Sequence, residues 1–309
     1  MQGFLKRKMD LIELFKKTVG LLRSNLILFL PPLVLAYLIP AALVLAGLYV
    51  FAPTLIVAAN SPTPLFVLIP GFIVAVGIVI VLALLAYAYV LAGWTGMNKN
   101  VALTGRTVFN DFWIGTKTYF RRIVGGIVVL AVVYILLVIA GVAATFAVIL
   151  PLIVKVLPTG IMPDAFTEIP SGLPQVAQII AAVGNTAGIW LIVATLAGMV
   201  FLFTVFWVQS ATLEDVGPLR ALIRSISFVK KNFKTTLGLV ALYIIATAFT
   251  GQIFPGGGGG GGAGGPSGGY GFGLVIPPPL EAIFRLLITT FFMLYMFVVY
   301  ADRTGKSVS

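Results

Sequence analysis

The sequence contains no cysteine and no histidine. Without cysteine the chain has no disulfide framework and no thiol chemistry. Without histidine it also lacks the usual ligands and bases of zinc, haem and Cys/His nucleophile sites. We therefore expect no metal and no other cofactor.

Charged residues are scarce as well, at 9% of the 309 residues, whereas a soluble domain carries about a quarter. Hydrophobic residues make up 60%, and the mean hydropathy is +1.11. So little polar surface cannot cover a globule in water, which indicates a surface exposed to lipid. The formal charge of +11 is carried by sparse cations beside apolar runs. This pattern is typical of membrane orientation, and we expect no nucleic-acid partner.

Acidic residues are the rarer charge, with only nine in the chain. Two clusters stand out, Glu214 with Asp215 and Asp164 with Glu168. A metal-dependent hydrolase needs several carboxylates in one cavity. An enzyme acting on lipid phosphoesters would require Asp111 to converge with Glu214 and Asp215, and nothing in the sequence predicts this. We expect no catalytic residues.

The apolar residues form runs long enough to cross a membrane, since about 20 residues span the hydrocarbon core. We predict an all-α, polytopic membrane helical bundle that forms a single membrane domain over residues 1–309. The first span should bend near its prolines. The predicted spans are 26–51, 65–93, 123–154, 189–210, 235–254 and 281–300, joined outside by loops 52–64, 155–175 and the flexible Gly/Pro-rich loop 255–280.

The distribution of Lys and Arg predicts the orientation. Segments 1–24, 94–122, 213–234 and 301–309 hold 18 of the 20 basic residues. They alternate with segments that are almost free of Lys and Arg, as the positive-inside rule expects for an even number of spans. We therefore predict a multi-pass protein of the cytoplasmic membrane with both termini in the cytoplasm.

An internal repeat is suggested by the basic segments. Residues 15–26 read FKKTVGLLRSNL, 113–124 read WIGTKTYFRRIV, and 222–233 read LIRSISFVKKNF. Asn25 aligns with Asn232, and the middle copy lacks the asparagine. We predict three parallel hairpin repeats over about 8–93, 108–212 and 216–302, each preceded by a cytoplasmic interfacial amphipathic helix. The alternative is chance similarity between apolar hairpins with basic flanks.

The stretch 213–238 is the clearest copy. Leu219, Leu222, Ile223, Ile226, Val229 and Phe233 fall on one helical face, and cations fall on the other. Such a helix buries its apolar side at the headgroup boundary. Glu214 and Asp215 precede the helix, where its dipole favours acids. The cations either contact anionic lipid or a protein partner, or only anchor the topology. The candidate contact residues are Lys16, Lys17, Arg23, Arg121, Arg122, Arg220, Arg224, Lys230, Lys231 and Lys234.

Two further patterns lie in the apolar runs. Glu281 and Arg285 are four residues apart and could form a local ion pair or a gate. Gly184 and Gly188, also four apart, could allow close helix contact.

The stretch VQSATLEDVGPLRALIRSISFVKKNF resembles the membrane domain of glycerophosphoryl diester phosphodiesterases and related uncharacterised, especially archaeal, six-span proteins. The matching positions are Glu214, Asp215, Ala221, Ser225, Lys231, Asn232 and Phe233. The resemblance implies a membrane module that is sometimes fused to a soluble phosphodiesterase. No such domain is present in this sequence, so the resemblance implies no catalytic activity.

Together these features favour a membrane protein without catalysis of its own, acting as a scaffold, an accessory subunit or a lipid-interacting module. The alternative is a transporter or channel for an apolar or lipid-like solute, whose path needs no buried charge. An enzyme acting on lipid phosphoesters is the third hypothesis.

Overall fold

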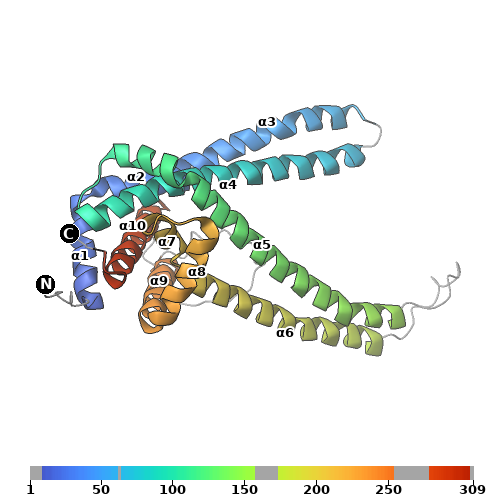
Figure 1. Cartoon of the computed structure of the whole chain (residues 1–309). Coiled ribbons are helices and arrows are strands. Elements are labelled where there is room, and N and C mark those ends of the chain that lie inside the picture. The colour runs from blue at the N-terminus through green and yellow to red at the C-terminus, as the bar shows by residue number, and fades with distance from the viewer. Residues whose placement is uncertain (1–8, 62–63, 157–172, 254–277, 307–309) are drawn as a thin grey trace, which may run out of the picture. The chain divides into compact units, whose positions relative to one another are not determined.

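The computed structural model describes residues 9–61, 64–156, 173–253 and 278–306, and every regular element within them is a helix (Figure 1). The chain forms two compact units: residues 1–127 with 206–309, and residues 128–205. Five helices in the described part are long and apolar enough to cross a membrane. The protein is therefore an all-helical, multi-pass membrane protein.

The first unit begins with α1 (Leu11–Ser24), which Asp10 caps through a hydrogen bond from the Leu11 N–H to its carboxylate (2.7 Å). Asn25 ends α1. The chain then departs from regular α geometry, as its prolines led us to expect. It forms a 3₁₀ turn (Leu26–Phe29), α2 (Leu30–Leu33), a π turn (Val34–Leu38) and α3 (Ile39–Ala59).

The helix α4 (Pro64–Thr104) packs along α3 as an antiparallel hairpin (Figure 1). The predicted loop 52–64 is mostly wrong, because α3 continues through Pro53 to Ala59. Residues 54–59 are apolar and lie beside the start of α4, so extending the helix keeps their backbone groups hydrogen-bonded in a region with few water partners. The turn is confined to the residues between Ala59 and Pro64.

The second unit consists of most of α5 (Phe109–Val156) and of α6 (Leu173–Thr204). Within it, the Tyr134 hydroxyl donates to the Ala197 carbonyl (3.5 Å). Gly141 lies against Trp190 and Val193. Residues 157–172, which hold most of the predicted loop 155–175, lie outside the described residues.

The rest of the first unit is formed by α7 (Trp207–Leu213), α8 (Pro218–Lys231), α9 (Phe233–Ile253) and α10 (Pro278–Arg303). In α9 the apolar stretch with described side chains is Phe233–Ala248, which is shorter than a full span. Most of the predicted loop 255–280 lies outside the described residues.

Buried side chains concentrate where the Lys/Arg-rich segments lie, in residues 88–123, 206–229 and 292–301. All seven residues of α7 are buried. Elsewhere large apolar side chains are exposed, for example Leu45 at 68% in α3 and Ile135 at 57% in α5. Apolar exposure of this extent suits lipid contact.

Candidate functional site

The two asparagines of the predicted repeat each stand at a break between helices. Asn25 follows α1, and Asn232 separates α8 from α9. Ile123 occupies the aligned position in the middle copy, and there α5 runs on without interruption. The separate amphipathic helix predicted for the middle copy is therefore absent, because no asparagine competes for the backbone at that point.

Asn25 also joins two segments that are far apart in sequence. Its side-chain amide donates to the Gly105 carbonyl (3.0 Å) and accepts from the Thr107 N–H (2.9 Å). Gly105 ends α4 with φ of +79°, a conformation that suits glycine. The side chain of Asn25 is therefore the link between α1 and the connection from α4 to α5. The Asn232 amide, by contrast, donates to Phe228 of its own helix (3.0 Å).

A buried hydroxyl lies seven residues before each aligned position. Thr18, Thr116 and Ser225 are all at most 4% exposed. Thr18 and Thr116 donate to the carbonyls of Leu14 (2.7 Å) and Phe112 (2.9 Å). Ser225 instead accepts from the Phe206 N–H (3.2 Å), at the break between α6 and α7. That bond satisfies a backbone group that the interruption leaves without a helical partner.

Glu214 is at the centre of a polar cluster. Its carboxylate accepts a hydrogen bond from the Tyr300 hydroxyl of α10 and pairs with Arg224 of α8. The Glu214 side chain is only 14% exposed, so these two partners supply hydrogen bonds in a place that few water molecules reach. The Tyr300 ring stacks on Phe228 (4.5 Å between centroids), which holds α8 and α10 together.

Asp215 makes the second ion pair, with Arg122 of α5. The hydrogen bond from Arg122 is the main cause that lowers the pKa of the Asp215 carboxyl; burial opposes it, and the charge of Arg122 lowers the pKa further. Asp215 has φ of +59°, a left-handed conformation that Asp tolerates better than most residues. The contacts of Glu214 and Asp215 with arginines explain these acids more directly than the predicted favourable position before α8.

Two lysines complete the cluster through backbone carbonyls. Lys99 of α4 donates to the Tyr119 hydroxyl (2.7 Å) and to the Thr212 carbonyl (2.9 Å). Lys306 donates to the Leu213 carbonyl. Burial lowers the pKa of the Lys306 ammonium.

These contacts bring all four basic segments together. Asn25 joins 1–24 to 94–122, and Arg122 joins 94–122 to 213–234. Lys306 joins 213–234 to the C-terminal segment. Arg303 joins the C-terminal segment to the N-terminal one by donating to the Met9 carbonyl (3.2 Å). We call this closed ring of segments 9–25, 94–122, 206–234 and 295–306 the basic end. Figure 1 shows α1 beside α10 there.

The basic end presents a mixed apolar and cationic surface. In α8 the predicted apolar face is divided, because Leu222 and Val229 are buried while Leu219 and Ile223 are 62% and 65% exposed. Arg220 and Lys231 lie on the side of the helix next to this exposed apolar strip. In α1, Leu14 is buried, and Ile12, Phe15 and Val19 are exposed beside Lys16 and Arg23.

The ten candidate cations fall into two groups. Arg122 and Arg224 pair with acids, and Lys17 is partly buried with an interaction of its own. The other seven are exposed and have no ion pair to a described acid: Lys16, Arg23, Arg121, Arg220, Lys230, Lys231 and Lys234.

The sequence analysis missed Lys99, Tyr300 and Lys306. The signal available for them was the acidic pair itself, which lies in one of the Lys/Arg-rich segments, where cations are in excess.

The carboxylates do not gather as a metal site within the described residues. Asp111 accepts from the Thr107 hydroxyl (2.8 Å) and the Val108 N–H (2.9 Å) at the start of α5, which is a helix-capping role. Glu214 and Asp215 are engaged with Tyr300 and arginines. Through these contacts the three acids hold helices and segments in place.

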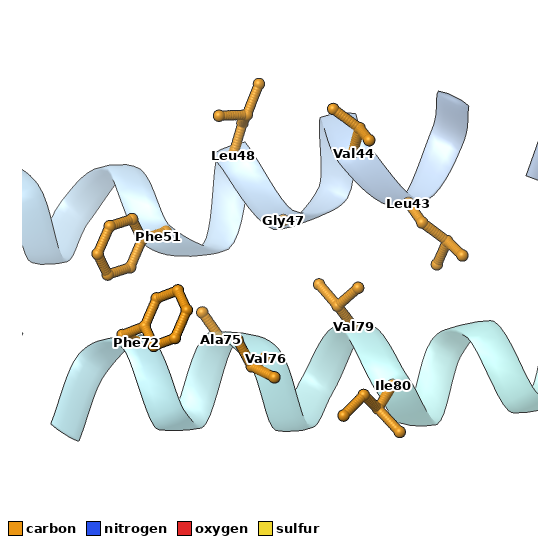
Figure 2. Close-up of a pocket in the computed structure, with 10 residues that line it drawn as sticks. All are labelled: Leu43, Val44, Gly47, Leu48, Phe51, Phe72, Ala75, Val76, Val79 and Ile80. Atoms are coloured by element: carbon orange, nitrogen blue, oxygen red, sulfur yellow. The ribbon is translucent and has the colours of Figure 1, made fainter. Parts of the chain in front are cut away.

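A separate, wholly apolar groove of about 390 Å³ lies between α3 and α4 (Figure 2). The rings of Phe51 and Phe72 meet edge to face at one end of it (5.8 Å between centroids). Gly47 leaves room near Val79 in the middle. The complete lining is Leu43, Val44, Gly47, Leu48, Phe51, Phe72, Ala75, Val76, Val79 and Ile80.

Comparison with known proteins gives one match. Residues 9–257 match the family described as "Domain of unknown function (DUF7847)". No curated protein and no solved structure matches the chain. The matched residues include α1 through α9 and therefore most of the basic end. Since the match covers more than half of the sequence, the chain belongs to the DUF7847 family.

Proposed function

We propose that this protein is a six-span membrane module without catalysis of its own, whose basic end lies at the cytoplasmic face and contacts anionic lipid headgroups. It would act as a scaffold or accessory subunit for a protein partner in the same membrane. The observation that carries the proposal is the closed ring of four basic segments. This proposal agrees with the membrane module implied by the resemblance to phosphodiesterase membrane domains.

The ring supports six spans by connectivity. The chain leaves the basic end after Asn25, returns to it by Lys99, and leaves again along α5. It leaves a third time along α9 and returns at Tyr300. If α10 crosses the membrane toward the basic end, α9 must cross in the other direction. The 21 residues of α9 extend about 31 Å, enough for the hydrocarbon core.

The three parallel repeats are supported by the buried hydroxyls at Thr18, Thr116 and Ser225. The aligned residues Leu14, Phe112 and Ala221, four positions earlier in each copy, are also buried, at most 8% exposed. Chance similarity of basic flanks does not require equal burial at matched positions. The repeated feature is a helix packed through one hydroxyl and one apolar residue at the basic end.

Headgroup contact is supported by the surface chemistry of α1 and α8. An exposed apolar strip beside exposed cations suits a helix that lies at the boundary between acyl chains and headgroups. Each Lys or Arg near an anionic leaflet contributes about 1 kcal/mol. Three such cations around Asn232 therefore correspond to roughly a hundredfold preference for an anionic over a neutral surface.

The test replaces Lys230, Lys231 and Lys234 together by Glu in the full chain. We expect the purified variant to retain fewer phosphatidylglycerol molecules than the wild type, counted by native mass spectrometry after mixing with phosphatidylglycerol and phosphatidylcholine. A control reverses Lys117 and Arg106, which are exposed and lie outside α8 and α9. Equal phosphatidylglycerol retention by wild type and triple variant would count against headgroup contact at this surface.

A second candidate function rests on the groove in Figure 2. Because its lining is entirely apolar, it suits an acyl chain or another lipid-like solute, as a transporter or channel for such solutes would require. Binding of a fluorescent fatty acid to the wild type, and its loss when the groove is filled, would favour this function over a scaffold.

A further inference from the structure

A second polar site lies far from the basic end, between α9 and α10. Five residues line a pocket of about 240 Å³ there: Tyr243, Thr247, Arg285, Ile288 and Thr289. We propose that this pocket binds the phosphate group of a lipid from the leaflet opposite the basic end, with Arg285 as the main ligand. The proposal does not depend on headgroup contact at the basic end, but it does require α9 and α10 to span the membrane.

The position of Arg285 along α10 matches the opposite interface. Arg285 precedes Arg303, a residue of the ring, by 18 positions. At 1.5 Å per residue this is about 27 Å, close to the roughly 30 Å thickness of the hydrocarbon core. A guanidinium at this depth can reach lipid phosphates by extending its side chain toward them.

Arg285 is also unusual in its surroundings. Among the side chains that the structure describes in the apolar helices away from the basic end, it is the only Lys or Arg. Arg285 already has an interaction within the protein, and its guanidinium carries five N–H donors, so it can hold a phosphate in addition. The planar guanidinium offers two parallel donors to a phosphate, a geometry that an ammonium does not provide.

The remaining lining groups fit a phosphate less strongly. Thr247 and Thr289 donate their hydroxyl hydrogens to the carbonyls of Tyr243 (2.9 Å) and Arg285 (2.8 Å). Either hydroxyl would have to give up this helical bond to donate to a phosphate, so we assign each a minor part. The Tyr243 ring is held edge to face against Phe292 (5.2 Å between centroids), which fixes this wall of the pocket.

The size of the pocket suits the phosphate of a lipid headgroup better than a complete soluble ligand. Its volume of about 240 Å³ is below the range of roughly 300–1,000 Å³ for drug-sized ligands. Arg285, Thr247 and Thr289 are all exposed, so the pocket opens sideways toward the surrounding lipid. A lipid could place its phosphate here while its acyl chains stay in the bilayer.

The experiment measures phosphatidylglycerol binding to the full chain by native mass spectrometry, for wild type, R285Q and R285K. We expect R285Q to weaken the tightest binding step by about tenfold or more, since a charge-assisted hydrogen bond is lost. R285K should be intermediate, because it keeps the charge without the paired donors. T289V should change binding by less than about threefold, since a neutral hydrogen bond is weaker.

Two further arms separate the alternatives. E281Q tests whether the acid four residues earlier is the partner of Arg285. The proposal is overturned if E281Q and R285Q lower the thermal stability equally and R285Q still binds lipid like the wild type. Displacement of the lipid by millimolar inorganic phosphate would overturn the lipid assignment in favour of a free anion. The triple Glu variant at Lys230, Lys231 and Lys234 should keep this binding step, so that failure at one end is distinguishable from failure at the other.

Discussion

Asn25 and Asn232 occupy the same place in the predicted repeat but make different contacts. The Asn25 side chain is 4% exposed and bonds to two backbone groups of the connection between α4 and α5. Asn232 is less buried, and its amide bonds to Phe228 of α8. The same residue type thus serves long-range docking in one copy and a local helix end in the other.

At the residue scale we predict unequal costs for the two asparagine replacements. Asn25→Ala leaves the Gly105 carbonyl and the Thr107 N–H without their partner and should lower the free energy of unfolding by about 1–3 kcal/mol. Asn232→Ala, the matched control, should cost less than about 1 kcal/mol. Thermal unfolding of both variants in detergent measures the difference. An equal loss for the two would contradict the docking role of Asn25.

Helices α4 and α5 approach each other more closely than the sequence suggested. A Cβ on Gly96 would lie 2.5 Å from the Gly115 Cα, and one on Gly115 would lie 2.8 Å from the Gly96 Cα. Two facing glycines allow this backbone contact. The predicted pair Gly184 and Gly188 has open space instead. Spacing alone cannot identify which glycine faces a neighbour, because that depends on how the helices rotate and cross.

At the element scale we predict that the hairpin of α3 and α4 accepts a single apolar chain in its groove. Replacing Gly47 and Ala75 by Leu fills the space between Phe51 and Val79 and should abolish binding of a fluorescent fatty acid, measured by its emission in detergent. The control places one Leu at Gly77, where a Cβ meets nothing within 4 Å. Undiminished probe binding by the filled variant would remove the groove as a site.

For the whole molecule, the helical membrane class and most span positions follow from composition and apolar runs. The six-span count, the repeat and the cytoplasmic orientation stay predictions. The polar contacts at the basic end could not be predicted, because they join residues such as Lys99, Asp215 and Lys306 that are far apart in sequence. The sequence predicts which charges share a side of the membrane. Only the packing of the helices decides which of them pair and which stay exposed.

The absence of cysteine makes the topology directly testable. Single cysteines at Ser24, Thr104, Ser227 and Ser61 can be labelled with a maleimide that does not cross membranes, before and after the cells are opened. We expect the first three to react only after opening, and Ser61→Cys to react in intact cells. A cysteine at Ser267 should behave like Ser61→Cys if α9 spans. The opposite result at Ser267 would leave five spans and contradict the six-span proposal.

The contact between the first and last helices also has a consequence for the order of synthesis. Phe15 of α1 packs against Phe291 and Tyr295 of α10, and Tyr295 donates to the Leu11 carbonyl (2.9 Å). The ribosome completes almost the whole chain before α1 can meet this partner. During that interval the side of α1 that carries Phe15 lacks its α10 partner, and the membrane surface can cover it. The exposed strip and cations of α1 would then hold it in the interface until α10 arrives and the ring closes.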